Sequence, residues 1–431
     1  MEIRDPVHGS IPIYDSEIEI LEHPFFQRLR NIKQLGFSEY VFPGATHTRY
    51  LHSIGVMNVS TLVFNNLFKD QSSSEILRLK ETLRLGCLLH DIGHAPLSHS
   101  TESVMPNVSA LKLPKQFEVS QDRQASHEDY TIKSITDSSF TQSFRGVKAE
   151  FGIEPDAVAE LVVGETKHPE YFTIKGVNYF PLLHQLVSSE MDCDRMDYLL
   201  RDSYFCGVSY GKFDLDWIID NLKVCPEGNQ AFLGISERAI STFDDFLLSR
   251  FHMFMMVYFH YRAVCLEQML LRYFESAKSE YSIPADIEAY LEHDDPYLYK
   301  VLKKSSNVWA KRIVKNNIPK KILETFGAAH LPQMDKLEQF LKSENIDYIK
   351  CSSKGRLSKY YSATSPQTHY PMKVMRESSL LSKNHTSFKN IQDATDLFQK
   401  YSESHAVNRI HCDFDELKPA AQKRIQEIIQ A

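Results

Sequence analysis

The sequence predicts a mainly α-helical protein with a smaller α+β region at its C-terminal end. In the first two thirds of the chain, apolar residues recur at three- and four-residue steps, the spacing of one buried helical face. Before about residue 275 we find no regular alternation typical of strands, except a possible short hairpin at 224–233. After about residue 281, short apolar runs alternate with helical pieces. We therefore expect a helical domain over residues 1–280 and an α+β region over 281–431 that serves oligomerisation or covers a pocket.

The composition is that of an ordinary globular protein. The 431 residues are 42% hydrophobic and 24% charged, enough for a sizeable core. The 49 Lys and Arg face 56 Asp and Glu, a net charge of −7 that argues against a nucleic-acid polymer or an anionic membrane as partner. An anionic ligand would then need a local basic site or a metal. Seven dispersed cysteines without a CxxC pair, and no signal peptide, predict a cytoplasmic protein.

The helical spacing runs through five segments: 25–35, 51–68, 76–89, 179–200 and 243–274. The most apolar stretch, 251–266, contains His252, His260 and Arg262. It is also shorter than the roughly 20 apolar residues of a membrane span. We therefore interpret it as a buried core helix.

The helix that begins near residue 76 leads into a polar group. Pro96 disfavours helical geometry before it, so the helix is predicted to stop near Gly93. His90 and Asp91 then follow directly on a buried apolar run. A buried imidazole and carboxylate are costly unless they are paired or bind a cation. Their nitrogen and oxygen atoms suit a divalent transition metal.

Two further segments carry functional residue types at helical spacing. Arg49 and His52 are three apart, and Asp194, Tyr198 and Asp202 lie at i, i+4 and i+8, so each set shares one helix face.

Two other charged pairs are left out of the site. Asp197 and Arg201, four apart, are interpreted as a surface ion pair. The second His-Asp pair, His293 and Asp294, is interpreted as solvated in an exposed loop.

The pattern of His52, His90-Asp91 and Asp194 resembles the H…HD…D signature of the HD-domain phosphohydrolases, and most closely their deoxynucleoside-triphosphate triphosphohydrolase branch. The resemblance covers roughly residues 1–275. Besides Arg250 and Tyr258, the similar segments are 5–9, 26–36, 41–44, 49–56, 90–99, 127–128 and 194–202.

The resemblance implies a role for each matching residue. His52, His90, Asp91 and Asp194 would bind one divalent metal ion, with Fe, Mn, Ni, Zn and Mg all open. His94 and His127 would handle protons beside Glu102, which stands where the family has Asp. The positions that match substrate contacts are Arg49, His99, Arg195 and Arg250 for phosphates, and Gln34, Tyr198, Asp202 and Tyr258 for the sugar.

The implied activity is hydrolysis of a deoxynucleoside triphosphate to deoxynucleoside and triphosphate, by water attack on the α-phosphorus in a homo-oligomeric enzyme. We expect Arg49, Arg195 and Arg250 to concentrate positive charge at the metal. Two alternatives stay open: a nucleotidase or phosphodiesterase acting on mono- or cyclic nucleotides, and a nucleotide sensor with weak or no catalysis. Arg4 and Glu22 depart from the residues with which family members read an activator nucleotide, so such a site is only partly matched. The preferred base stays open.

Overall fold

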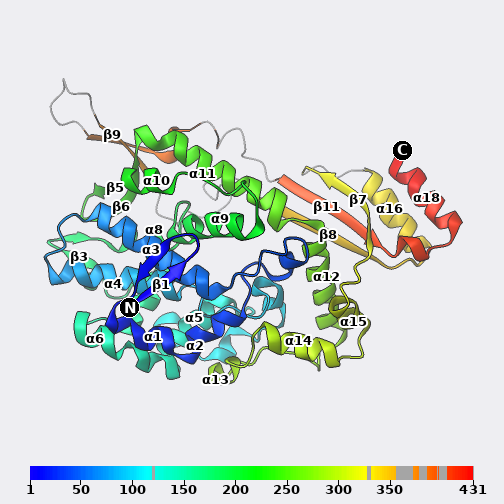
Figure 1. Cartoon of the computed structure of the whole chain (residues 1–431), viewed down its shortest axis with the longest axis horizontal. Helices are drawn as coiled ribbons and strands as arrows, with labels where there is room; N and C mark the ends of the chain where they lie inside the picture. Colours follow the sequence, from blue (N-terminus) through cyan, green and yellow to red (C-terminus); the bar gives the residue numbers. More distant parts are fainter. Residues whose placement is uncertain are drawn as a thin grey trace.

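The computed structural model of the chain describes residues 1–118, 122–327, 332–355, 372–377, 386–395, 397 and 405–430. Helices make up most of the chain as far as residue 314, and a three-stranded sheet with two helices stands at one end of the longest axis (Figure 1). The prediction of a mainly α fold with a smaller α+β C-terminal region is confirmed. Among the described residues, no helix has the length and hydropathy needed to cross a membrane.

Helix α3 (Arg49–Leu67) lies at the centre of the helical part and is buried along most of its length. It packs against α4 (Ser74–Leu89) and α9 (Cys193–Cys206), while α5 (His127–Thr136) and α7 (Pro155–Val163) pack against each other beside α4. A helix buried on nearly all sides needs apolar or paired residues on every face. The helices that hold or directly precede the predicted metal ligands therefore pack around α3 in the core.

The interpretation of 251–266 as one buried core helix is wrong, because the chain interrupts the helix within this stretch. Helix α11 (Ile240–Met253) ends in a π-helical turn, Phe254–Tyr258, and α12 (Tyr261–Ser276) starts anew. The His260 ring accepts a hydrogen bond from the Arg262 amide at 3.4 Å and so caps the new helix. Wide π turns of this kind occur often at functional sites.

The predicted hairpin at 224–233 is confirmed as strands β5 (Leu222–Glu227) and β6 (Gln230–Ser236). The turn needs Gly228, whose φ of +61° is unfavourable for other residues. Its sheet joins distant parts of the chain, with β6 paired to β4 and to β9. The remaining strands of this sheet are β3 (Thr173–Ile174), β4 (Val177–Asn178), β9 (Lys373–Glu377) and β10 (Thr386–Asn390).

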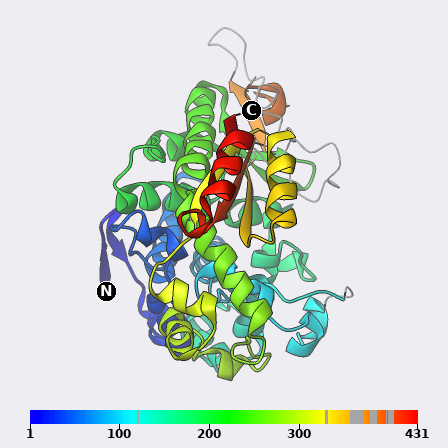
Figure 2. The same ribbon diagram turned by 90° about the vertical axis from the view of Figure 1, so that its right-hand side faces the viewer.

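The C-terminal sheet is antiparallel, in the order β7-β11-β8. Helices α16 (Pro332–Ser343) and α18 (Pro419–Gln430) lie over one of its faces (Figure 2), where Leu323, Leu337 and Ile425 form a separate small core. Strand β8 also contacts α12 of the helical part. The strands are β7 (Lys320–Phe326), β8 (Tyr348–Gly355) and β11 (His405–Cys412).

Three helices after residue 280 share the core of the helical part: α13 (Ile287–Tyr290), α14 (Asp295–Lys304) and α15 (Val308–Val314). We therefore propose that the boundary lies near Pro319, directly before β7.

The interpretation of His293 and Asp294 as solvated residues is wrong. His293 is only 9% exposed and its carbonyl accepts hydrogen bonds from Arg28, while Asp294 caps α14 by accepting from the Tyr297 amide at 2.9 Å. Both residues are structural.

Candidate metal centre and active site

Helix ends place the predicted metal ligands. His52 lies in the first turn of α3, and Asp194 lies in the first turn of α9, whose start is capped by Asp192. Helix α4 ends at Leu89, four residues before the predicted Gly93, so His90 and Asp91 follow the helix instead of forming its last turn. Side chains from three helix ends thereby meet at one point.

Three of the four predicted ligands, His52, His90 and Asp194, place their ligand atoms close enough to share one ion, whereas Asp91 approaches the two histidines through different oxygens. Asp194 Oδ1 is 2.9 Å from His52 Nε2 and 3.7 Å from His90 Nε2. Asp91 Oδ2 is 3.7 Å from His52 Nε2, and its Oδ1 is 3.4 Å from His90 Nε2. Atoms that each bind a metal at about 2.1 Å lie about 3 to 4.2 Å apart, so this spacing suits one shared ion.

The two predicted histidine ligands are oriented in a way that suits a metal. Their Nδ1 atoms are engaged, His52 with Asp197 at 2.8 Å and His90 with the Cys87 carbonyl at 2.7 Å. Both Nε2 atoms are buried without an aligned hydrogen bond. A histidine backed in this way by a carboxylate or carbonyl is the usual arrangement at metal sites. His52, His90 and Asp194 can accordingly hold an ion.

Electrostatics at this point favour a cation. Burial by itself lowers the pKa of His52, but the nearby carboxylates of Asp194 and Asp197 outweigh it and raise the pKa to about 9. For His90, burial is likewise outweighed by Asp91 and Asp194, and the pKa rises to about 10. A site that attracts a proton this strongly attracts a metal ion for the same reason.

Asp91 is shared among several groups. Arg49 contacts its Oδ2, and His94 Nε2 lies 3.1 Å from its Oδ1. Although burial opposes ionisation, Arg49 and His90 hold the pKa of Asp91 well below its usual range. This carboxylate therefore connects the metal ligands to Arg49 and His94.

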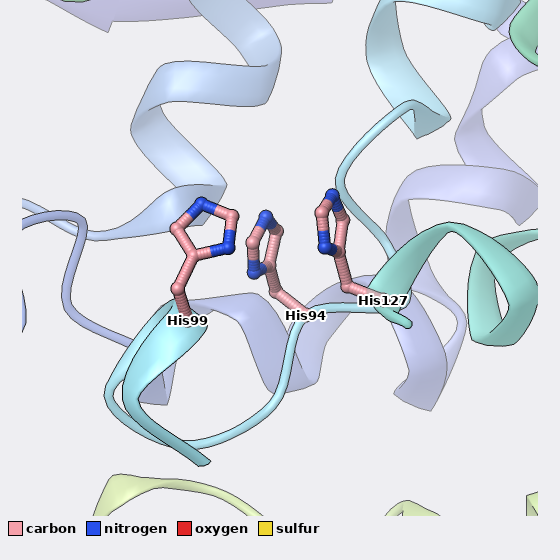
Figure 3. A group of neighbouring side chains, drawn as sticks. All are labelled: His94, His99 and His127. Carbon is pink, nitrogen blue, oxygen red and sulfur yellow. The ribbon is translucent and has the colours of Figure 1, made fainter. Parts of the chain in front are cut away.

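His94, His99 and His127 form a second histidine cluster (Figure 3), which Asp91 joins to the first through His94. The rings of His94 and His127 stack with centroids 4.0 Å apart and planes 13° apart, and His99 stands edge-on to both. Distance alone allows these residues to hold an ion. However, the in-plane lone pairs of two stacked rings run parallel and do not converge on one metal.

The cluster is better arranged for proton transfer. Glu102 Oε1 lies 2.5 Å from His127 Nδ1 and 3.1 Å from His99 Nδ1. Burial, followed by the nearby Arg49, lowers the pKa of His94 well below its usual range, so its imidazole is neutral. Gly93 allows this packing, because a Cβ there would lie 2.2 Å from the His127 carbonyl oxygen.

Both clusters open into a cavity of about 970 Å³. Twelve of the fifteen predicted site residues line it: Gln34, Arg49, His90, Asp91, His94, His99, His127, Asp194, Arg195, Tyr198, Asp202 and Tyr258. Of the other three, His52 is fully buried beside Asp194, and Glu102 contacts His127. Arg250 is not brought to the cavity wall and pairs with Glu190 at 2.9 Å.

The far side of the cavity presents hydrogen-bonding groups. Asp202 Oδ2 accepts a hydrogen bond from Tyr258 at 2.7 Å, and its Oδ1 lies 2.7 Å from His47 Nε2. Gln34 Oε1 is buried at the wall without an aligned partner. Sequence reasoning missed His47, which precedes α3 and carries no recognisable spacing signal.

The expectation that three arginines concentrate positive charge at the pocket is wrong. Arg49 contacts Asp91, Arg250 pairs with Glu190, and Arg195 lies 3.8 Å from Asp192. The cavity wall carries nine Asp or Glu side chains and four Lys or Arg. A buried guanidinium needs a carboxylate partner, so its charge is neutralised locally. A polyanionic ligand would therefore depend on metal charge.

The interpretation of Asp197 and Arg201 as a surface pair is also wrong. Both side chains are fully buried, and Asp197 contacts the metal-ligand candidate His52. The spacing of Asp194 and Asp197 could have indicated the buried position of Asp197. Asp197 follows the predicted metal ligand Asp194 by three residues and so lies on a similar side of α9.

The HD-domain family profile matches residues 49–202, from the first residue of α3 to Asp202 in α9. This chain belongs to the HD-domain family. The matched HD domain contains all four predicted metal ligands and both histidine clusters.

The similarity of this chain to other proteins extends beyond the HD domain. The uncharacterized protein YwfO of Bacillus subtilis is 33% identical over 277 residues, covering 64% of this chain and 55% of YwfO. The human deoxynucleoside triphosphate triphosphohydrolase SAMHD1 is 26% identical over 325 residues, covering 70% of this chain and 50% of SAMHD1. The chain thus spans about half the length of these relatives. The crystal structure of a hypothetical protein from Aquifex aeolicus matches with a TM-score of 0.73 at 26% identity, covering 99% of both chains.

Proposed function

We propose that this HD-domain protein hydrolyses deoxynucleoside triphosphates to deoxynucleoside and triphosphate. One observation carries the proposal: a single cavity joins His90, Asp91 and Asp194 to the polar group of Gln34, Asp202 and Tyr258. A phosphoryl group at the first set leaves room for a sugar at the second. The similarity to SAMHD1, whose name states this reaction, supports the same choice.

The residues suit water attack at a phosphorus atom. A divalent ion held by His52, His90, Asp91 and Asp194 would supply Lewis-acid polarisation of a phosphoryl oxygen and of a water. In the proposed reaction the water oxygen bonds to the α-phosphorus, the bond to the sugar 5′-oxygen breaks, and that oxygen takes a proton. The neutral His94 can accept a proton, and His127, backed by Glu102 at 2.5 Å, can donate one.

The opposite side of the cavity would select a deoxyribose. Tyr258 now donates to Asp202, and a sugar 3′-hydroxyl can replace it as donor to the same oxygen. The unpartnered Gln34 Oε1 is a second acceptor at the wall. Tyr198, whose ring stands edge-on to Tyr258 with centroids 6.3 Å apart, narrows the space where a 2′-hydroxyl would lie. We also propose that the active form is a homo-oligomer.

Product analysis tests the proposal. Purified protein, after elemental analysis of its bound metal, is incubated with dNTPs, NTPs, dNMPs and cyclic nucleotides, and the products are separated by anion-exchange chromatography. We expect equimolar deoxynucleoside and triphosphate from dNTPs. Release of pyrophosphate or phosphate without triphosphate, or turnover of only mono- or cyclic nucleotides, would contradict the proposal. Light scattering of the same sample measures the oligomeric state.

A further inference from the structure

We propose that Asp197 is a positioning residue for the metal ligand His52, and that the N-terminal hairpin holds Asp197 in place through His8 and Asp5. The inference rests on the proposed metal site and concerns residues that our sequence reasoning assigned to the surface or left without a role. If the inference holds, the hairpin of β1 (Glu2–Asp5) and β2 (Gly9–Pro12) supports the proposed metal site.

Each oxygen of Asp197 meets two nitrogen atoms. Oδ2 lies 2.8 Å from His52 Nδ1 and accepts from Arg201 Nε at 2.8 Å. Oδ1 lies 2.6 Å from His8 Nε2 and accepts from Arg201 Nη2 at 2.8 Å. Asp197, Arg201 and His52 are fully buried. With four nitrogens around two oxygens, this carboxylate has no freedom to rotate.

This arrangement sets the tautomer of His52. A guanidinium can only donate, so Arg201 keeps both Asp197 oxygens as acceptors. When a metal ion replaces the proton on His52 Nε2, the proton that remains on the ring belongs on Nδ1, facing Asp197. Nε2, 2.9 Å from Asp194, is then the nitrogen that faces the metal. A carboxylate behind a histidine ligand both fixes the ring and makes it a better donor to a metal.

Asp5 supports this arrangement in two ways. Its Oδ2 accepts a hydrogen bond from Arg201 Nη1 at 2.7 Å, which anchors the guanidinium on the side away from Asp197. Its Oδ1 accepts from the backbone amides of Val7 and His8, both at 2.8 Å. These two bonds shape the turn between β1 and β2, and the turn directs the His8 ring to Asp197.

The close approach of α3 and α9 is built for this contact. A Cβ added to Gly55, three residues after His52, would lie 2.0 Å from Asp197 Oδ1 and 2.2 Å from Arg201 Nη2. Any other residue at position 55 would therefore push the carboxylate or the guanidinium away.

The buried ion pair of Glu17 and Arg84 provides a control that distinguishes positioning of a metal ligand from stabilisation of the fold. Glu17 accepts from Arg84 Nε at 2.8 Å and from Nη2 at 2.9 Å, and both side chains are buried. It thus resembles Asp197 in charge, burial and arginine partner. None of the contacts described for Glu17 involves a metal-ligand candidate.

The test measures metal affinity without substrate. Metal-free wild type, Asp197→Asn and Glu17→Gln are titrated with Co²⁺ against a competing chelator, and the visible spectrum of bound Co²⁺ is recorded. Asp197→Asn is expected to bind Co²⁺ about 10- to 100-fold more weakly and with an altered spectrum, as is typical when the residue behind a ligand is lost. Glu17→Gln is expected to melt at a lower temperature but to keep wild-type affinity and spectrum.

A second variant keeps the test decisive if Asp197→Asn does not fold. His8→Ala leaves Asp197, Arg201 and His52 in place, and we expect about 3- to 10-fold weaker Co²⁺ binding because only one support is lost. If Asp197→Asn binds Co²⁺ with wild-type affinity and spectrum, this inference is overturned while the proposed metal site stands. If Asp197→Asn cannot be purified in folded form, the same result in His8→Ala overturns the inference. Failure of the wild type to bind Co²⁺ would instead overturn the proposed metal site and this inference together. Neither readout depends on which nucleotide is hydrolysed.

Discussion

Replacing Glu102 by Gln tests the histidine cluster as a proton-transfer device. The carboxylate contacts His127 and His99 through one oxygen, Oε1, at 2.5 and 3.1 Å. Although partial burial opposes ionisation, the hydrogen bonds from His127 and His99 lower the pKa of Glu102 far below its usual range. At neutral pH the wild-type residue is therefore charged, and the Gln variant removes that charge without changing the shape of the side chain.

The size of the effect follows from these two contacts. A hydrogen bond to a charged group contributes about 1.5 to 3 kcal/mol, so the pair contributes about 3 to 6 kcal/mol before solvent screening. Because Glu102 is partly exposed, we take about half, about 1.5 to 3 kcal/mol, as acting on the transition state. At about 1.4 kcal/mol per factor of ten, kcat should fall about 10- to 150-fold.

The assay compares kcat, KM and metal content for Glu102→Gln and a matched control, Glu128→Gln. Glu128 is exposed at the wall of the same cavity. Its replacement removes one negative charge from the wall and leaves the contact between Glu102 and His127 intact. We expect a lower kcat only in Glu102→Gln, with bound metal unchanged in both variants. An equal, small decrease in the two variants would refute the role given to Glu102 and His127.

Three further predictions concern metal, pH and packing. Chelation should abolish hydrolysis and weaken triphosphate binding measured by calorimetry, because carboxylates outnumber basic groups at the cavity wall, and both should return on adding Mn²⁺. If chelated protein kept full activity, the metal requirement would be wrong. Burial raises the pKa of Glu267 from its usual 4.5 to about 7, so the contribution of this residue to stability is lost as the pH rises from 4.5 through 7. In urea unfolding, Glu267→Gln should therefore increase the free energy of unfolding by about 1 to 2 kcal/mol at pH 8 and leave it unchanged at pH 4.5. An equal gain at both pH values would exclude titration as its cause. Gly93→Ala should cost about 2 to 3 kcal/mol in thermal unfolding, because the new Cβ would lie 2.2 and 2.3 Å from backbone atoms of His127 and Thr131; an unchanged melting temperature would contradict that packing.

The sequence alone was sufficient for the parts of the site that lie close together along the chain. The apolar period predicted the helices that became α3 and α4, and the polar residues after Leu89 marked His90 and Asp91. The segment predicted over 179–200 is instead broken into α8 (Phe180–Val187) and α9. The step of four from Asp194 to Tyr198 and Asp202 predicted one face of α9, and all three line the cavity. Local spacing succeeds here because a helix places residues three or four apart on the same side.

Only the tertiary structure showed which charged side chains are buried and which partners they have. Asp197 and Arg201 have the spacing of an exposed ion pair, yet they are buried because Gly55 lets α3 approach them and because Asp5, 196 residues from Arg201, completes the network. Arg250 matched a phosphate-binding pattern but is neutralised by Glu190. The helix predicted over 251–266 is interrupted where Tyr258 reaches Asp202. Periodicity reports which face of a helix is apolar, whereas the dielectric around a charge and the partner it finds depend on residues that only folding brings together.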